Sequence, residues 1–365
     1  MVYDFQPNWV YHPSQTILEF LSIKEIDSCC LEDSFTERLN KQELSIDSNM
    51  ATYLVGLLGG SEDFWLNIQF NYEKNLRRFQ NSDVDDNFST YQNLIKEMKK
   101  NSWLPSAEYK YLDQLNLKSF FGVSDFSPIN EESIYTNSLG TRYKKIGRYE
   151  FSTLNLAAFM RKAELEAKSK NIKSDFNKSL FLEKLQEIKV LSKKKGLRNF
   201  EQELSEICAK CGVAIVFLNA LEKCPIRGVS KFVDNKGIIV ITDKYNKDYI
   251  FWQTFFHEAA HLILHQDEMT HYDFGEPNDY EEDSKCEQEA DDFMVSQLLH
   301  PLSYEEVKRK IDFKLVYKSK KLSWKNLCTV ANELSISTSL LVGVFKASKD
   351  IEYRFFNNGH KPVFD

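Results

Sequence analysis

The residues with the clearest chemical meaning lie in one stretch, FWQTFFHEAAHLILH, at positions 251–265. It contains the pattern HExxH, formed by His257, Glu258 and His261. On a helix of 3.6 residues per turn, positions i and i+4 lie one above the other, so both imidazoles can bind one metal ion. Glu258 would lie beside them and take a proton from a water molecule at the metal. The pattern therefore predicts a zinc site with Glu258 as the catalytic residue.

A second acidic segment, CEQEADDF at positions 286–293, follows this stretch. Glu287 and Glu289 point about 200° apart on a helix, so only one of them can face the histidines. Glu287 has Asp291 one helical turn further on, where a carboxylate can accept the ring N–H of a ligating histidine. We predict that Glu287 is the third metal ligand and that Asp291 orients a histidine. Glu289 is the alternative ligand.

The composition limits the class of protein. A chain of 365 residues has room for two or three domains, and its 42% hydrophobic content is ample for buried cores. It has no apolar run long enough for a membrane span and no signal-peptide character at the N-terminus, so no membrane association is expected. Seven cysteines without a disulfide framework predict a reducing cytoplasm. A net charge of −7 disfavours a protein that coats nucleic acid over its whole surface.

Helical patterns dominate the first 200 residues. Residues 1–80 are expected to form a module of short helices, in which Asp47 or Ser48 begins a helix that Gly59 and Gly60 end. This arrangement is compatible with a helix-turn-helix and equally with a plain helical bundle. A helical middle region is expected over 81–200, beginning with a polar, acidic linker at 81–92.

The pattern changes after Gly212. Runs of β-branched residues at 213–217 and 237–242 predict strands, with a third candidate at 229–233. The metal helix follows from about residue 248, then a polar loop over 266–284 and an acidic helix over 285–299. We expect the strand at 237–242 to lie near the metal, with an edge that could align a peptide.

The predicted fold class is α+β: a helical N-terminal module, a helical middle region, and a small β-sheet packed on the HExxH helix. The metallopeptidase domain is expected at 201–305 and a C-terminal helical region at 306–365.

The chain resembles the ImmA/IrrE family of metallopeptidases. The resemblance lies in FWQTFFHEAAHLILH and in EQEADDFMVSQLLHP, where the family pattern looks like ExEADxFAxxxLxP. At the front, HPSQTILEFL and LLGGSEDFWLNIQFNYE resemble the HigA-type antitoxin helix-turn-helix, and the ending ANELSISTSLLVGVF resembles the tail of the same fused architecture. The resemblance implies a zinc-dependent endopeptidase of gluzincin type that cleaves a specific protein, such as a transcriptional repressor or a toxin, and so regulates gene expression.

Two features depart from the family pattern. Between His12 and Asn40 the chain is shorter by roughly two turns of helix, at the place of the first helix of the DNA-reading pair. Residues 27–33 are acidic there, which is unfavourable beside phosphate. His300 stands before Pro301 where the family usually has an apolar residue. We therefore expect DNA binding to be weak or absent.

Two other hypotheses compete with the enzyme. The chain could be a HigA-like antitoxin or transcriptional regulator that binds DNA or a toxin, with a structural or sensory metal site. It could also be a scaffold that binds no metal. Glu258 favours the enzyme, because a purely structural site needs no general base. The sequence carries no signal for an oligomeric state.

Overall fold

The computed structural model describes residues 11–26, 31–79, 86–107, 110–123, 152–224, 226–265, 270–273, 283–311, 324–352, 355–356 and 360–364. The chain divides into two compact units, at residues 1–130 and 131–365. The fold class is α+β, as the sequence predicts. The division at residue 130 lies inside the predicted helical middle region, so the helices of that region belong to both units.

The first unit is helical. Its elements are α1 (Pro13–Ile23), α2 (Asp33–Asn40), α3 (Ser48–Leu58), α4 (Glu62–Phe79), the 3-10 helix η2 (Asp86–Tyr91), α5 (Gln92–Lys100) and α6 (Lys110–Phe121). The predicted start of α3 is confirmed, because the Asp47 carboxylate accepts a hydrogen bond from the Met50 N–H at 2.8 Å. Gly59, with φ of 80°, ends the same helix.

Part of the predicted linker at 81–92 is packed. Residues 81–85 lie outside the described residues, but η2 buries Phe88 and Tyr91, which are 1% and 6% exposed. Burial of large aromatic side chains is strongly favourable, so residues 86–91 pack as a short helix instead of forming an extended linker.

The second unit holds the sheet and the metal helix. Its elements are α8 (Thr153–Ser169), α9 (Lys178–Ile188), η5 (Lys189–Lys193), η6 (Leu197–Asn199), α10 (Glu201–Lys210), β1 (Val213–Leu218), β2 (Gly228–Val233), β3 (Lys236–Thr242), α11 (Asp248–Leu264), β4 (Thr270–Asp273), α12 (Asp283–Leu299), α13 (Tyr304–Lys310), α15 (Trp324–Glu333) and α16 (Thr338–Ala347). The three predicted strands and both predicted helices of the site are therefore present.

The four strands pair in the order β1-β3-β2-β4. β1 is parallel to β3, while β2 is antiparallel to both β3 and β4. The expectation that a peptide could add to the edge of residues 237–242 is wrong, because β3 lies between β1 and β2 and has both edges paired. β4 was not expected either, since it forms within the predicted loop at 266–284.

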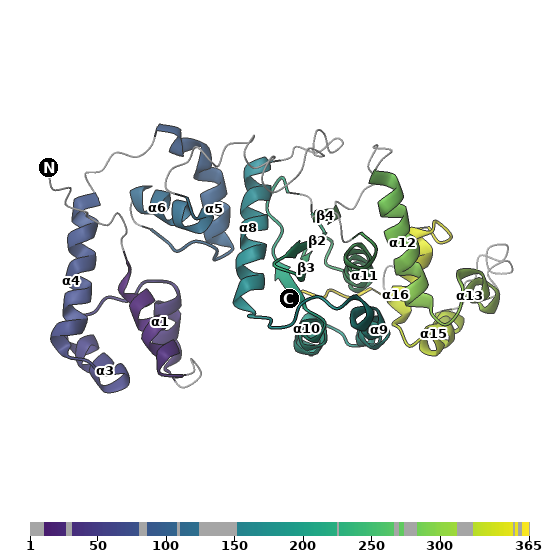
Figure 1. Ribbon diagram of the computed structural model, residues 1–365, viewed down its shortest axis with the longest axis horizontal. Coiled ribbons are helices and arrows are strands. Elements are labelled where there is room, and N and C mark those ends of the chain that lie inside the picture. Colours follow the sequence, from purple (N-terminus) through teal and green to yellow (C-terminus); the bar gives the residue numbers. More distant parts are fainter. Residues whose placement is uncertain are drawn as a thin grey trace. The chain divides into compact units, whose positions relative to one another are not determined.

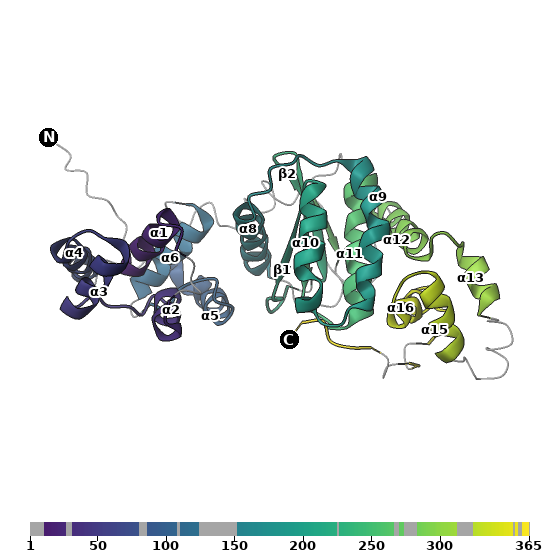
Figure 2. The ribbon, with the colours of Figure 1, turned by 90° about the horizontal axis from the view of Figure 1, so that it is seen from below.

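The two faces of the sheet are covered by different helices. Side chains alternate along a strand, and on β2 Ser230 contacts α11 whereas Lys231 contacts α8. Figures 1 and 2 show α8 on one side of the sheet and α11 on the other. On the α11 side, Ile215, Ile239 and Ile241 belong to the main core of this unit.

That core is continuous from α9 to the end of the chain. It includes α11 residues such as Phe255 and Phe256, α12 residues such as Leu298, and α16 residues such as Phe345. The predicted peptidase domain and the predicted C-terminal helical region thus share one core. In the described part of the chain, no single helix is long and apolar enough to cross a membrane. The bent pair α15 and α16 passes this test only by length and composition.

Candidate metal centre

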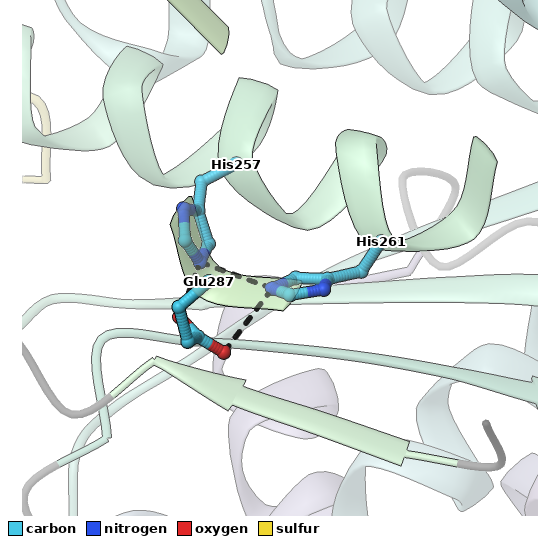
Figure 3. Close-up of side chains that lie close together, drawn as sticks. All are labelled: His257, His261 and Glu287. Atoms are coloured by element: carbon cyan, nitrogen blue, oxygen red, sulfur yellow. Dashed lines mark hydrogen bonds and ion pairs between the residues drawn. The ribbon is translucent and has the colours of Figure 1, made fainter. Parts of the chain in front are cut away.

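The predicted metal helix forms as α11 and is buried on almost every side. His257 and His261 are 7% and 1% exposed, so the two imidazoles are removed from water. Their four-residue spacing places both rings on the same side of the helix, as Figure 3 shows. The Nε2 atoms of the two rings are 3.1 Å apart.

α12 brings Glu287 to the two histidines. One carboxylate oxygen of Glu287 lies 3.1 Å from His257 Nε2 and the other lies 3.5 Å from His261 Nε2. In Figure 3, dashed lines join His261 to His257 and to Glu287. Within the described ranges, these three side chains form the group of donors that could hold a metal ion, with all donor atoms within 4.8 Å of one another.

Asp291 and Glu289 lie on different sides of α12. The Asp291 carboxylate is 2.9 Å from His257 Nδ1, which leaves Nε2 of that ring directed toward Glu287. Glu289 instead faces His265 at 3.8 Å and Lys285 at 3.7 Å. The two acids thus make different contacts: Glu287 contacts His257 and His261, whereas Glu289 contacts His265 and Lys285.

The three donors suit a tetrahedral metal ion. Zinc binds histidine nitrogen and carboxylate oxygen at about 2.0–2.2 Å, which places neighbouring donors roughly 3.3 Å apart in a tetrahedron. The two Nε2 atoms, 3.1 Å apart, are close to that value, and the Glu287 carboxylate presents one oxygen 3.1 Å from His257 Nε2 and the other 3.5 Å from His261 Nε2. Two histidines and one glutamate also form a typical donor set of catalytic zinc, with a fourth position left for water.

Glu258 is fully buried beside the sheet, with 0% of its surface exposed. Its Oε2 atom accepts a hydrogen bond of 2.6 Å from the Ser230 hydroxyl on β2. Gly228, two residues earlier on the same strand, packs directly on Glu258, because a Cβ there would lie 2.7 Å from Oε1. Sequence reasoning missed both residues. The available signal was their spacing of two, which puts them on one face of a strand.

Polar contacts with residues before the sheet fix the carboxyl end of α12. The buried Lys189 ammonium donates a hydrogen bond of 2.6 Å to the carbonyl of His300, directly after the helix. Gln186 Nε2 donates to the Gln297 side chain at 2.8 Å. Burial lowers the pKa of Lys189 to about 8, but a cation at the carboxyl end of a helix is favourable. These contacts hold the helix that presents Glu287.

The amino end of α11 is fixed by a buried polar network. The Ser339 hydroxyl donates to Asp248 at 2.5 Å and lies 2.6 Å from His360 Nδ1. The Lys346 ammonium lies 2.8 Å from His360 Nε2, so that nitrogen acts as an acceptor and the ring is neutral. The network joins α16 and the C-terminal segment to the first turn of the metal helix.

In comparisons with known proteins, no family model, no curated protein and no solved structure matches this chain. The functional interpretation therefore rests on the site itself.

Proposed function

We propose that this protein is a zinc-dependent endopeptidase. The observation that carries the proposal is the convergence of His257, His261 and Glu287, a donor set typical of catalytic zinc, with donor atoms within 4.8 Å of one another. Glu258, the acid next to the first histidine, supplies the base that a structural site does not need. We propose a cytoplasmic location, because the five described cysteines are free thiols.

Each side chain has a distinct role in the proposed reaction. A zinc ion held by the three donors would lower the pKa of a coordinated water toward about 7 and polarise a peptide carbonyl. Glu258 accepts a proton from the attacking water and delivers it to the amine nitrogen as the C–N bond breaks. Asp291 keeps His257 in the ring orientation that directs the Nε2 lone pair toward the metal.

The resemblance to the ImmA/IrrE family supports a single protein as the substrate, such as a repressor or a toxin. The buried site is consistent with narrow specificity, because His261 and Glu258 are almost wholly enclosed. A general protein substrate such as casein is therefore a poor test of activity.

Metal content is the sharper test. The wild-type protein and His261→Ala would be purified side by side from zinc-supplemented medium and analysed by elemental mass spectrometry. We expect about one zinc per wild-type chain and a loss of most of it in the variant. The separations between the three side chains also permit hydrogen bonds among them, as a metal-free scaffold would need. Absence of metal from both proteins would therefore favour the scaffold.

The alternative function concerns the N-terminal unit, residues 1–130. Its helices could bind DNA or a toxin, as the resemblance to HigA-type antitoxins implies. However, residues 27–33 are acidic at the place where the DNA-reading pair is expected to begin, which is unfavourable beside phosphate. The metallopeptidase is therefore the function that the geometry supports best.

A further inference from the structure

We infer that Ser230 is a positioning residue that holds Glu258 in the orientation required for proton transfer, and that Gly228 provides the space for it. The inference rests on the proposed function. It adds two residues of β2 to a centre that otherwise comes from α11 and α12.

The first step concerns the face of the sheet on which Ser230 lies. Its partner on β3 is Ile239, and Gly228 pairs with Ile241 in the same antiparallel register. Both isoleucines are at most 1% exposed, and Ser230 itself is 0% exposed. A hydroxyl in such surroundings is costly unless it is hydrogen-bonded, and here it donates to the Glu258 carboxylate.

The second step concerns the closeness of β2 to α11. A Cβ at Gly228 would lie 2.5 Å from Thr254 Cγ2, 2.7 Å from Glu258 Oε1 and 2.9 Å from Glu258 Cγ. Thr254 and Glu258 are one helical turn apart, so the strand backbone at Gly228 lies against both side chains. Any larger residue there would displace the glutamate from the sheet.

The third step is the chemical consequence. A glutamate side chain has three rotatable bonds, and a general base must keep its oxygen within hydrogen-bonding reach of the proton it takes. A hydroxyl donor 2.6 Å from Oε2 restricts those rotations in a pocket that Gly228 leaves open. Among the described residues, the Ser230 hydroxyl bonds to Glu258 rather than to His257, His261 or Glu287, so its loss should spare metal binding.

The test uses the full-length protein loaded with Co²⁺, whose visible spectrum reports on the site. The probe is acetohydroxamic acid, which chelates a metal through two oxygens and can donate a hydrogen bond to a neighbouring carboxylate. We expect Ser230→Ala to retain Co²⁺ but to bind acetohydroxamic acid about tenfold more weakly, as a charged hydrogen bond is lost or misdirected. Glu258→Gln should show at least the same loss.

Two variants separate positioning from a general packing effect. Ser230→Thr keeps the hydroxyl and should bind the hydroxamate within about twofold of wild type. Thr242→Val removes another buried hydroxyl of the sheet, which donates to the Ile226 carbonyl at 2.8 Å, and should leave hydroxamate affinity unchanged. If Ser230→Ala does not fold, Ser230→Cys preserves the volume with a weaker donor and should show an intermediate loss.

Wild-type hydroxamate affinity in Co²⁺-loaded Ser230→Ala or Ser230→Cys would overturn the inference while leaving the proposed function intact. An equal loss in Thr242→Val would overturn it as well, because the effect would then come from the sheet as a whole. A wild-type chain that takes up no Co²⁺ would remove the proposed function and, with it, the positioning role of Ser230.

Discussion

Both ring nitrogens of His257 are in contact with acids of α12, and the two acids have different roles. Asp291 lies at Nδ1, and Glu287 lies at Nε2 with His261. A carboxylate that accepts the Nδ1–H fixes the tautomer, so that the Nε2 lone pair is directed toward the metal site. Glu289 has its contacts elsewhere, with His265 and Lys285.

At the residue scale, the two glutamates of α12 should behave differently. We predict that Glu287→Ala abolishes tight zinc binding, because it removes one of three donors, whereas Glu289→Ala leaves zinc affinity nearly intact. Competition titration against a chromophoric zinc chelator would measure both. Zinc retention that followed Glu289 instead would mean that α12 is rotated relative to the described arrangement.

A smaller effect is expected at Asp291. Its carboxylate is 2.9 Å from His257 Nδ1, but the side chain is 58% exposed. We therefore expect Asp291 to orient His257 while remaining in contact with water. We predict that Asp291→Asn weakens zinc affinity by roughly ten- to a hundredfold. The same chelator titration applies, with Asp292→Asn as the control. Asp292 contacts Gln288 rather than a histidine. Equal losses in the two variants would contradict the orienting role of Asp291.

At the scale of elements, α11 is held by close packing at its amino end. Gly343 in the middle of α16 lies against Tyr249, since a Cβ there would be 2.5 Å from the tyrosine Cδ2 and 2.8 Å from its Cβ. The tyrosine cannot move aside by rotation alone, because its own Cβ is one of the atoms in contact. The two helices would have to separate.

We therefore predict that Gly343→Ala destabilises the second unit by about 1–3 kcal/mol through overpacking. Thermal unfolding followed by circular dichroism would detect the lower midpoint. Gly56→Ala in α3 is the matched control, because a Cβ there has nothing within 4 Å. That change should stabilise the first unit by about 0.5–1 kcal/mol. A stabilised Gly343→Ala would contradict the close approach of α16 and α11.

At the scale of the whole molecule, the C-terminal segment makes stability depend on pH. Burial, together with the positive charges of Lys346 and Lys247, lowers the pKa of His360 from 6.5 to about 4. The unfolded chain therefore binds a proton at higher pH than the folded chain does, so stability should fall as pH falls from about 6.5 to about 4. Burial raises the pKa of Asp248, which acts in the opposite direction over the lower part of this range.

The comparison that isolates His360 is with His360→Gln. Above pH 6.5 the variant should be less stable than wild type, because it lacks the imidazole that contacts Ser339 and Lys346. The difference between their unfolding midpoints should narrow as pH falls toward 4, since only wild type has this histidine to protonate. A difference that stayed constant with pH would show that His360 is not held neutral.

DNA binding is the second property of the whole chain. We predict weak or no binding, because the net charge is −7 and the segment expected to begin the DNA-reading pair is shortened and acidic. Footprinting of the full-length protein on its own promoter at moderate salt would test this. A clear footprint would show that the N-terminal unit reads DNA despite these charges.

The sequence alone determined what depends on local periodicity. The i, i+4 spacing of His257 and His261 predicted their shared face, and the spacing of Glu287 and Asp291 predicted which acid of α12 would face them. The strands at 213–217 and 237–242 followed from their β-branched residues, and the start of α3 followed from Asp47. These features depend on backbone geometry within a few residues, so a sequence displays them directly.

Only the tertiary structure decided what depends on pairing between distant segments. β3 became an inner strand because β1 and β2 both pair with it, which no local pattern in residues 237–242 reveals. Ser230 reached Glu258 across 28 positions of sequence, and His360 reached Lys346 through the packing of the C-terminal segment. Such contacts are fixed by the total burial of apolar surface in a shared core, a property of the whole chain rather than of any segment.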